Sequence, residues 1–573
     1  MERTVIERAR QWLAPQFDEA TRREVQQMID TDPVALEDSF YKNLEFGTGG
    51  LRGLMGAGTN RINRYTVAMA TQGLAHYVKR AQSGPYRAAI SYDCRHSSAD
   101  FAHITAQVLA ANDFDVYLFD ALRPTPELSF AVRQLHCHVG VMITASHNPK
   151  EYNGYKVYWN DGAQVIAPHD QNIILEVQKI TDPSQARMEG GKGKITMMGK
   201  EMDDQYLTSI LSLLRLSPEA IESHKDLKMV YTPLHGTGVR LVPEALRRMG
   251  FTHILHVSEQ DVNDGAFPTV PSPNPEEPAA LEMAVRKARE TGADLVMATD
   301  PDADRVGIAV RNLQGEMELL NGNQTASLLT YYLLSRWKEL GRLKGNEFVV
   351  KTIVTTDLLR LLADHFGVEC YNVLTGFKFI AQVVREQEGR KVFISGGEES
   401  YGYNVGSFVR DKDAVVACAL VAEVACWAAA QGKSLYQLLV DIYTQFGFFK
   451  ESLMSKAMKG KDGMEQMKAL MEGYRQRPPQ TLGGSPVVLV HDYQNSETVD
   501  LVSDLRYVIN LPKSDVLQFV CADNTLVTIR PSGTEPKIKF YFGVRCPLKE
   551  AADFEAVNVL AENKLATLKE LFN

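Results

Sequence analysis

The sequence contains no run of about 18 apolar residues, the length that a membrane-spanning helix needs. Its seven cysteines are scattered, odd in number and include no C-x-x-C pair, a pattern typical of reduced thiols in a cytosolic protein. The segment Met1–Arg10 is charged and amphipathic and lacks the apolar core of a signal peptide. We therefore expect a cytoplasmic protein with no membrane partner.

An excess of positive charge is also missing, because the formal net charge is −9 and the pI is about 5.9. This balance argues against non-specific binding to nucleic acid. Any phosphate-binding cleft must then be a local positive site in an acidic protein. The hydrophobic content of 45% and charged content of 23% are those of an ordinary globular protein. At ~100–200 residues per domain, the chain of 573 residues should form several domains.

Strand and helix patterns alternate over residues 65–450, which is typical of βαβ units and mainly parallel sheets. After residue 486, closely spaced strand patterns precede one long helical pattern at 548–571, which favours an antiparallel α+β module. We expect surface loop or hairpin at Met188–Lys200 and a polar hinge region at 451–485.

The predicted fold class is α/β. It consists of three consecutive α/β domains with mixed, mainly parallel sheets plus a C-terminal α+β domain with an antiparallel sheet, around a central cleft. The expected domains are 1–205, 206–321, 322–450 and 451–573.

A polar loop, Thr144–Pro149, follows the apolar run Val139–Ile143. Ligands bind at the carboxyl ends of strands in open α/β sheets, so Ser146 is placed where a nucleophile could act. His147 lies beside it, and Lys156 follows in the next predicted strand. The alternative is a serine that only caps or turns the backbone.

The stretch Leu44–Gly58 is rich in glycine, so its backbone could approach a ligand closely. Arg52 lies within it and could pair with phosphate through its planar guanidinium. A flexible surface turn is the alternative.

Asp300, Asp302 and Asp304 occupy alternate positions directly after an apolar strand pattern. Carboxylates at this density are suitable ligands for Mg²⁺ or Ca²⁺. An EF-hand loop also begins in this way, but it needs Gly at its sixth position and Glu at its twelfth, where this chain has Arg305 and Arg311. The pattern therefore predicts a divalent-metal site that is not an EF-hand.

Further polar loops offer candidate substrate-binding residues. Glu398 and Ser400 supply acceptors and a hydroxyl suited to a polyol, although an ordinary acidic loop would look the same. Arg530, Ser532, Gly533 and Thr534 could form a phosphate cradle or a tight hairpin turn. The other candidates are Thr375, Gly376, Lys378 and Lys412, the last of which could also belong to a charged helix start. The combination of nucleophile, metal, polyol and phosphate sites describes phosphoryl transfer to or from a phosphorylated sugar.

With these loops in view, the chain resembles the α-D-phosphohexomutase superfamily, and most closely its branch of bacterial α-phosphoglucomutases related to animal phosphoglucomutase 2. The resemblance covers nearly the whole chain in order. It is carried by Phe46-Gly-Thr-Gly-Gly-Leu-Arg52, Thr144–Pro149 with Asn153-Gly-Tyr-Lys156, Asp300–Arg305, Gly397-Glu-Glu-Ser400 and Arg530–Pro536.

The resemblance implies that Ser146 is the phosphoserine of the resting enzyme. It also implies that Asp300, Asp302 and Asp304, with a phosphate oxygen on Ser146, hold Mg²⁺. Among the remaining residues, those near the reacting phosphate would be Arg52, His147, Lys156 and Arg305. Those that read the sugar or grip the other phosphate would be Glu398, Ser400, Arg530, Ser532, Gly533 and Thr534.

One position departs from part of the superfamily, because some phosphomannomutase-type members have a histidine just after the Gly-Glu-x-Ser motif. This chain has Tyr401-Gly-Tyr403 there. The resemblance then assigns the positive charge to Lys412, as in phosphoglucomutases.

The implied activity is the interconversion of glucose 1-phosphate and glucose 6-phosphate, with glucose 1,6-bisphosphate as intermediate and activator. A mannose or pentose phosphate substrate, or a glucose 1,6-bisphosphate synthase, would use the same residues. A metal-dependent phosphatase and a non-catalytic sugar-phosphate sensor are more distant alternatives. The expected partners are small sugar phosphates.

Overall fold

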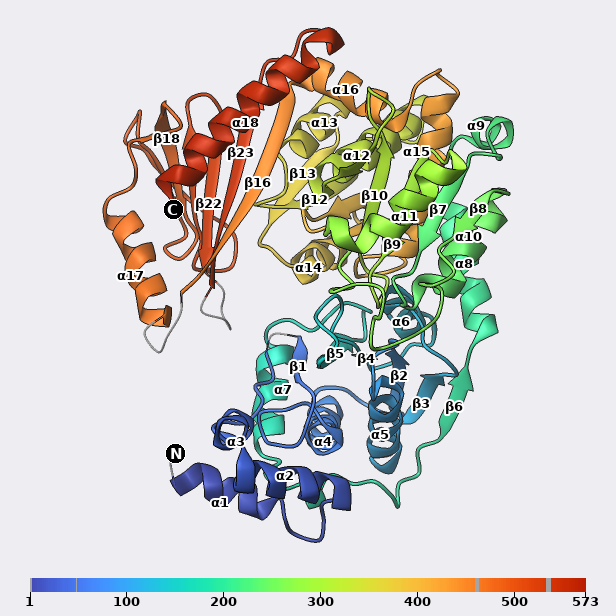
Figure 1. Ribbon diagram of the computed structural model, residues 1–573, viewed down its shortest axis with the longest axis vertical. Helices are drawn as coiled ribbons and strands as arrows, with labels where there is room; N and C mark the ends of the chain where they lie inside the picture. The colour runs from blue at the N-terminus through green and yellow to red at the C-terminus, as the bar shows by residue number, and fades with distance from the viewer. Residues whose placement is uncertain (1–2, 48, 459–462, 532–536) are drawn as a thin grey trace. The chain divides into compact units, whose positions relative to one another are not determined.

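The computed structural model describes residues 3–47, 49–458, 463–531 and 537–573. The chain divides into two compact units. The first contains Met1–Gly322, Ala381–Gly396 and Ser400–Gln431, and the second contains Asn323–Ile380, Gly397–Glu399 and Gly432–Asn573. Figure 1 shows the course of the chain with its helices and strands labelled.

Three helices open the first unit: α1 Arg3–Gln11, α2 Glu19–Thr31 and α3 Pro33–Phe40. Trp12 stacks on Phe17 and meets the ring of Phe40 edge-on, and Val25 and Met28 are buried with them. These side chains form the buried core shared by the three helices.

The first sheet has the strand order β1-β5-β4-β2-β3-β6. Strands β4, β2, β3 and β6 run parallel, whereas β1 and β5 pair antiparallel at one edge. The strands are β1 Gly50–Leu54, β2 Arg87–Tyr92, β3 Asp115–Phe119, β4 Val139–Ile143, β5 Tyr152–Trp159 and β6 Ile195–Met198; the helices are α4 Arg64–Ala81, α5 Ser98–Ala111, α6 Thr125–Gln134 and α7 His169–Gln178, with a short 3₁₀ helix at Pro183–Gln185. Helix α5 packs on β2, β3 and β4, and α6 on β2 and β4. Every residue of β4 is buried, and the polar loop begins directly after it.

Two predictions in this region were wrong in part. The glycine-rich stretch is not loop throughout, because Gly50–Leu54 forms β1. A Cβ on Gly50 would lie 1.9 Å from the carbonyl oxygen of Tyr155, so this glycine serves close strand pairing. The Met188–Lys200 stretch contains β6, which pairs parallel with β3. Strand β6 has only four residues and follows Gly190-Gly-Lys-Gly-Lys194, a composition typical of a surface loop.

The second sheet has the order β11-β10-β9-β7-β8. Its strands are β7 Met229–Thr232, β8 Ile254–His256, β9 Leu295–Thr299, β10 Val306–Arg311 and β11 Met317–Leu320, and the nearby helices are α8 Lys200–Leu213, α9 Pro218–Ser223, α10 Gly238–Met249 and α11 Pro278–Thr291. Strands β9 and β10 pair antiparallel, and Thr299 at the end of β9 lies opposite Val306 at the start of β10. The segment Asp300–Arg305 is therefore the connection between two paired strands.

The third α/β region contains β12 Glu347–Thr352, β13 Glu369–Val373, β14 Val392–Gly397 and β15 Tyr403–Val405, together with α12 Gly322–Glu339, α13 Leu358–Phe366, α14 Phe377–Gln387, α15 Ala414–Ala429 and α16 Leu435–Phe446. Strands β12 and β13 pair parallel, as a βαβ unit requires.

The C-terminal region is an antiparallel sheet with the order β16-β23-β22-β21-β18-β19-β20, and β17 pairs with β18. Its elements are β16 Phe448–Ala457, β17 Thr481–Leu482, β18 Ser485–Asp492, β19 Glu497–Asp500, β20 Arg506–Val508, β21 Leu517–Cys521, β22 Leu526–Pro531, β23 Lys537–Cys546, α17 Gly463–Gln476, a 3₁₀ helix at Ala551–Asp553 and α18 Phe554–Leu571. The expected fold class, three α/β domains followed by an antiparallel α+β domain, is confirmed.

The stretch 451–485, expected to be a polar hinge region, contains regular structure in its described residues. Strand β16 pairs with β23 along its whole length, and α17 follows. All residues of β16 except the first are partly or fully exposed. The buried residues of α17 are Gly463, Met467 and Met471. Both elements therefore carry a weak apolar pattern.

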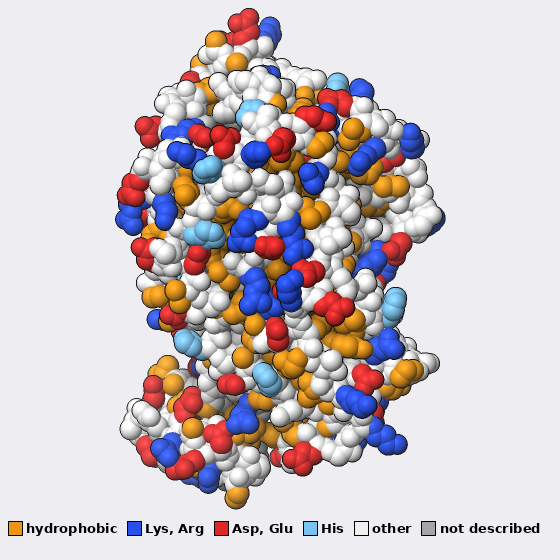
Figure 2. Space-filling model, turned by 90° about the vertical axis from the view of Figure 1, so that its right-hand side faces the viewer, with side chains coloured by type: hydrophobic (Ala, Val, Ile, Leu, Met, Phe, Trp, Pro, Cys, Tyr) orange, Lys and Arg blue, Asp and Glu red, His pale blue; other side chains and the backbone are white. Residues whose placement is uncertain are grey.

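Figure 2 shows one face of the molecule, on which Lys and Arg side chains are mixed with Asp and Glu side chains. The acidic net charge therefore does not form a uniform field over this face. No helix in the described part of the chain has both the length and the hydropathy to cross a bilayer. All seven cysteines are free thiols, as expected.

Candidate active site

Ser146 lies on the loop directly after β4 and is 3% exposed. Its backbone has φ 53°, a left-handed conformation that is strained for a residue with a Cβ. The Ser146 amide donates to Thr144 Oγ1 at 2.8 Å, and the hydroxyl donates to Asp300 Oδ2 at 2.7 Å. The loop thus brings the predicted nucleophile to the first of the three aspartates.

The loop is held in place by Arg95, which the sequence analysis did not identify as functional. Its guanidinium is fully buried and donates to the carbonyl oxygens of four residues: Ser146 at 2.6 Å, Pro149 at 2.8 Å, Tyr152 at 2.9 Å, and Asn148. Asp93 lies 3.3 Å from Arg95 Nε and accepts from Thr144 Oγ1 at 2.6 Å. Asp93 and Arg95 follow the buried strand β2, and charged residues in that position are the signal that could have revealed them.

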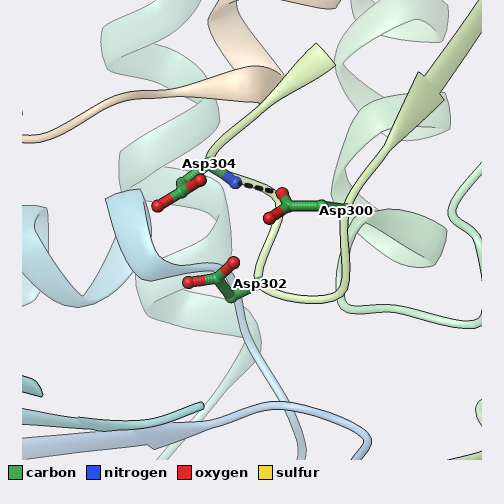
Figure 3. Close-up of side chains that lie close together, drawn as sticks. All are labelled: Asp300, Asp302 and Asp304. Carbon is green, nitrogen blue, oxygen red and sulfur yellow. Dashed lines mark hydrogen bonds between the residues drawn. The ribbon is translucent and has the colours of Figure 1, made fainter. Parts of the chain in front are cut away.

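Asp300, Asp302 and Asp304 converge as predicted, and one carboxylate oxygen from each lies within 4.8 Å of the others (Figure 3). Asp300 Oδ1 accepts from the amides of Asp304 at 3.1 Å and Arg305 at 3.0 Å. All three residues are buried. Burial, followed by the carboxylates of Asp302 and Asp304, raises the pKa of Asp300 well above its ordinary value. So much negative charge in one buried place favours a bound cation.

Two lysines neutralise one side of this cluster. Lys156 Nζ, from β5, lies 2.7 Å from Asp302 Oδ2 and 3.5 Å from Asp304 Oδ2. Lys412 Nζ lies 3.1 Å from Asp304 Oδ2. Burial would lower the pKa of Lys156, but the carboxylates of Asp302 and Asp304 outweigh it and raise this pKa, so the ammonium stays charged.

The remaining oxygens fit a hard divalent cation. Asp302 Oδ1 and Asp304 Oδ1 are buried and have no hydrogen-bond partner among the described residues. Buried carboxylate oxygens without partners are costly unless a cation binds them. The geometry is therefore suited to a metal ion whose ligands include these two oxygens.

Lys412 reaches the cluster because residue 402 is glycine. A Cβ at this position would lie 2.1 Å from Lys412 Cδ. The stretch Tyr401-Gly-Tyr403, which stands where some superfamily members have a histidine, therefore leaves space for the Lys412 side chain.

Three further predicted residues lie around the same loops. His147 Nδ1 is 3.2 Å from Ser146 Oγ, and burial followed by Arg305 and Arg52 lowers the pKa of His147 to about 2. Its ring is therefore neutral at neutral pH. Arg52, on β1, donates to Asn148 Oδ1 at 3.4 Å, and Arg305 pairs with Glu276.

A second group of predicted residues lies in the second unit. Glu398 is buried, and its Oε1 accepts from the amide of Gly376, a glycine with φ 121°. Thr375 Oγ1 is buried without a hydrogen-bond partner in the described residues, and Lys378 Nζ lies 5.2 Å from the ring centroid of Phe379.

Arg530 belongs to the same unit, at the end of β22, and its Nη1 is 3.5 Å from Tyr541 Oη. Burial raises the pKa of the Glu399 carboxyl. Hydrogen bonds, and after them the positive charge of Arg530, act in the opposite direction. Ser532, Gly533 and Thr534 lie outside the described residues. Ser400, like Lys412, belongs to the first unit.

Models of three protein domains match the chain in order. They are described as the α/β/α domains I, II and III of phosphoglucomutase/phosphomannomutase, and they match residues 43–184, 204–315 and 321–446. A phosphoglucomutase of Staphylococcus aureus strain USA300 is 39% identical over 539 residues, which is 94% of this chain and 95% of that protein. One from strain bovine RF122 is 40% identical over 513 residues, covering 89% and 91%.

Solved structures support the same fold. A phosphoglucomutase (pp63/parafusin) from Paramecium in an open form has a TM-score of 0.67 at 17% identity and covers 92% of this chain and 95% of its own. A phosphoglucomutase/phosphomannomutase family protein from Burkholderia thailandensis has a TM-score of 0.65 at 20% identity, covering 91% and 97%. The domain matches and the near-complete alignment with the staphylococcal enzymes lead to one conclusion: the chain belongs to the phosphoglucomutase/phosphomannomutase family of phosphosugar-mutating enzymes.

Proposed function

We propose that this enzyme interconverts glucose 1-phosphate and glucose 6-phosphate through a phosphorylated Ser146 and glucose 1,6-bisphosphate. The observation that carries the proposal is the contact of Ser146 Oγ with Asp300 Oδ2 at 2.7 Å, beside two buried carboxylate oxygens for which the described residues supply no hydrogen-bond partner. The staphylococcal relatives bear the name phosphoglucomutase, which favours glucose phosphates over other sugar phosphates.

The chemistry consists of two phosphoryl transfers. In the first, the bond between phosphorus and Ser146 Oγ breaks while the 6-hydroxyl oxygen of glucose 1-phosphate bonds to phosphorus, and the hydroxyl proton ends on Oγ. In the second, after the bisphosphate has turned around, Oγ bonds to the phosphorus of the 1-phosphate and its proton passes to the sugar O1. Hydrogen bonds from Ser146 to Thr144 and from Arg95 to Ser146 fix the backbone that carries Oγ, which supports positioning for both transfers.

Asp300, Asp302 and Asp304, with a phosphate oxygen on Ser146, would hold Mg²⁺, which when bound supplies charge neutralisation at the transferring group. Lys156 and Lys412 keep positive charge beside it. Since His147 has a pKa of about 2, it suits a hydrogen-bonding role at Oγ better than that of a general acid. We assign Arg52 and Arg305 to positioning the reacting phosphate.

We assign substrate recognition to the loops of the third and fourth domains, taken as 322–450 and 451–573. Glu398, held by the Gly376 amide, suits sugar hydroxyls, and Thr375, Lys378 and Ser400 would complete this set. Arg530 with Ser532, Gly533 and Thr534 would grip the phosphate that is not reacting, using remote binding energy to support transfer. Because the intermediate turns around, this grip must fit phosphate at either end of the sugar.

The first test is Ser146→Ala, which should abolish turnover and labelling of the protein by phosphate. Ser327→Ala is a matched control, because this buried hydroxyl donates to the carbonyl of Asn323 in its own helix. Its loss should leave activity intact. Substantial activity in Ser146→Ala would exclude the phosphoserine route.

The second test compares kcat/KM for the 1-phosphates of glucose, mannose and ribose, with Mg²⁺ and a trace of glucose 1,6-bisphosphate. A preference for glucose of tenfold or more, about 1.4 kcal/mol, supports the proposal. Equal or better use of another sugar would keep the Ser146 chemistry and change the substrate.

A further inference from the structure

Thr125, the first residue of α6, makes two hydrogen bonds to Asp302, which lies 177 positions later in the chain. Its hydroxyl donates to Asp302 Oδ2 at 2.8 Å, and its amide donates to the Asp302 carbonyl oxygen at 2.9 Å. Both residues are completely buried. The amide is available because the first amides of a helix have no partner within it.

The position of Thr125 is fixed by its neighbours. The amide of Arg123 donates to the Tyr92 carbonyl oxygen at 3.2 Å, and Ser91 Oγ donates to the Arg123 carbonyl oxygen at 2.9 Å. The Arg123 guanidinium binds both oxygens of Asp203, on α8, at 2.7 and 3.1 Å. The start of α6 is therefore tied to β2 and to α8, and Thr125 can transmit that rigidity to Asp302.

The orientation of the Asp302 carboxylate is fixed by hydrogen bonds from the Thr125 hydroxyl and from Lys156. Oδ2 receives Thr125 at 2.8 Å and Lys156 at 2.7 Å, whereas Oδ1 is buried without a hydrogen-bond partner in the described chain. A rotation that exchanged the two carboxylate oxygens would break both of these hydrogen bonds. A charge-assisted hydrogen bond to a carboxylate is among the stronger hydrogen bonds in proteins.

We propose that Thr125 is a positioning residue that holds Asp302 in the orientation in which Oδ1 is presented to the divalent cation. This inference rests on the metal site of the proposed function. It adds a residue that acts on the loop Asp300–Arg305, the metal loop, without touching metal or substrate.

The test measures the affinity of the purified, dephosphorylated full-length protein for Mn²⁺ by the electron paramagnetic resonance signal of free Mn²⁺. Thr125→Val keeps the shape of the side chain and removes the hydroxyl. We expect it to weaken Mn²⁺ binding by about 10–100-fold, the usual effect of losing an outer partner of a metal ligand. Thr125→Ser keeps the donor and should stay within about threefold of the wild type, by the same reasoning.

Thr105→Val is the matched control, because this buried hydroxyl donates instead to the helix carbonyl of Phe101, at 2.8 Å. It should bind Mn²⁺ like the wild type. Activity lost in Thr125→Val should return as Mg²⁺ is raised, which a general packing defect would not allow.

Wild-type Mn²⁺ affinity in a folded Thr125→Val variant would overturn the inference alone. If that variant does not fold, Thr125→Ala takes its place with the same expected loss, and wild-type affinity there has the same meaning. Absence of Mn²⁺ binding by the wild type would overturn the metal assignment together with this inference.

Discussion

Replacing Arg95 by methionine removes the cation that holds the Ser146 loop while keeping a side chain of similar length. In the native protein the buried guanidinium donates to four loop carbonyls and pairs with Asp93 at 3.3 Å. After the substitution Asp93 keeps three uncharged donors: Thr144 Oγ1, Ser98 Oγ and the amide of residue 95.

The expected cost follows from this arrangement. Removing one partner of a buried ion pair costs about 3–5 kcal/mol. The three remaining donors to Asp93 favour the lower end of that range, about 3 kcal/mol. Four carbonyls of one short loop lose their donor together, so the loss should be concentrated in local opening of residues 144–152.

Hydrogen exchange read by mass spectrometry measures this opening directly. A loss of about 3 kcal/mol corresponds to roughly 100-fold faster exchange of the amides in 144–152. Helix α4, whose described carbonyls accept nothing from Arg95, should exchange as in the wild type. The rate constant of phosphoryl transfer should fall with the loop opening, because Ser146 loses its fixed geometry.

Arg311→Met provides the control. Arg311 also donates to two backbone carbonyls, of Gly315 and Ala293, and pairs with Asp294, but its side chain is 31% exposed. Exposed pairs contribute about 0–1 kcal/mol, so exchange near Ser146 should not change. If Arg95→Met left the exchange of 144–152 as slow as Arg311→Met does, the assigned role of Arg95 would be wrong.

Three further predictions follow from single contacts. Gly402→Ala should displace Lys412 and lower kcat without unfolding the protein. Gly473→Ala is the control and should leave activity unchanged, because its added Cβ would have no described atom within 4 Å; equal activity of the two variants would refute the reasoning. Burial raises the pKa of Asp413 to about 6, above its unfolded value, so its contribution to stability is present at low pH and is lost as pH rises from about 4 to 6. The free energy of unfolding of Asp413→Asn minus that of the wild type should therefore rise by up to about 3 kcal/mol over that range. A difference that does not change with pH in denaturant titrations would contradict this prediction. Arg530→Met should reduce kcat/KM by about 10–100-fold, as expected for a charged hydrogen bond to phosphate, with phosphorylation of Ser146 by glucose 1,6-bisphosphate at saturation preserved; an unchanged kcat/KM would remove Arg530 from the phosphate site.

Much of the fold could be predicted from the sequence, because buried strands such as β4 and β9 are continuous apolar runs that end in polar loops. The three aspartates at alternate positions after β9 indicated a metal site for the same local reason. Strand β6 was not predicted because it has only four residues beside a segment rich in Gly and Lys. Strand β16 was missed because it is only half-buried, and its local patterning is weak.

The sequence alone determined which residue types are available: a serine and three aspartates on loops that follow buried strands. Only the tertiary structure decided which of their atoms meet. Ser146 and Asp300 are 154 positions apart, and Thr125 and Asp302 are 177 apart, so no local pattern could pair them. Donors from strand β5 and from the start of helix α6, Lys156 and Thr125, bind Asp302 Oδ2. Within the described residues Oδ1 has no hydrogen-bond partner, because fixed donors determine the orientation of a buried carboxylate.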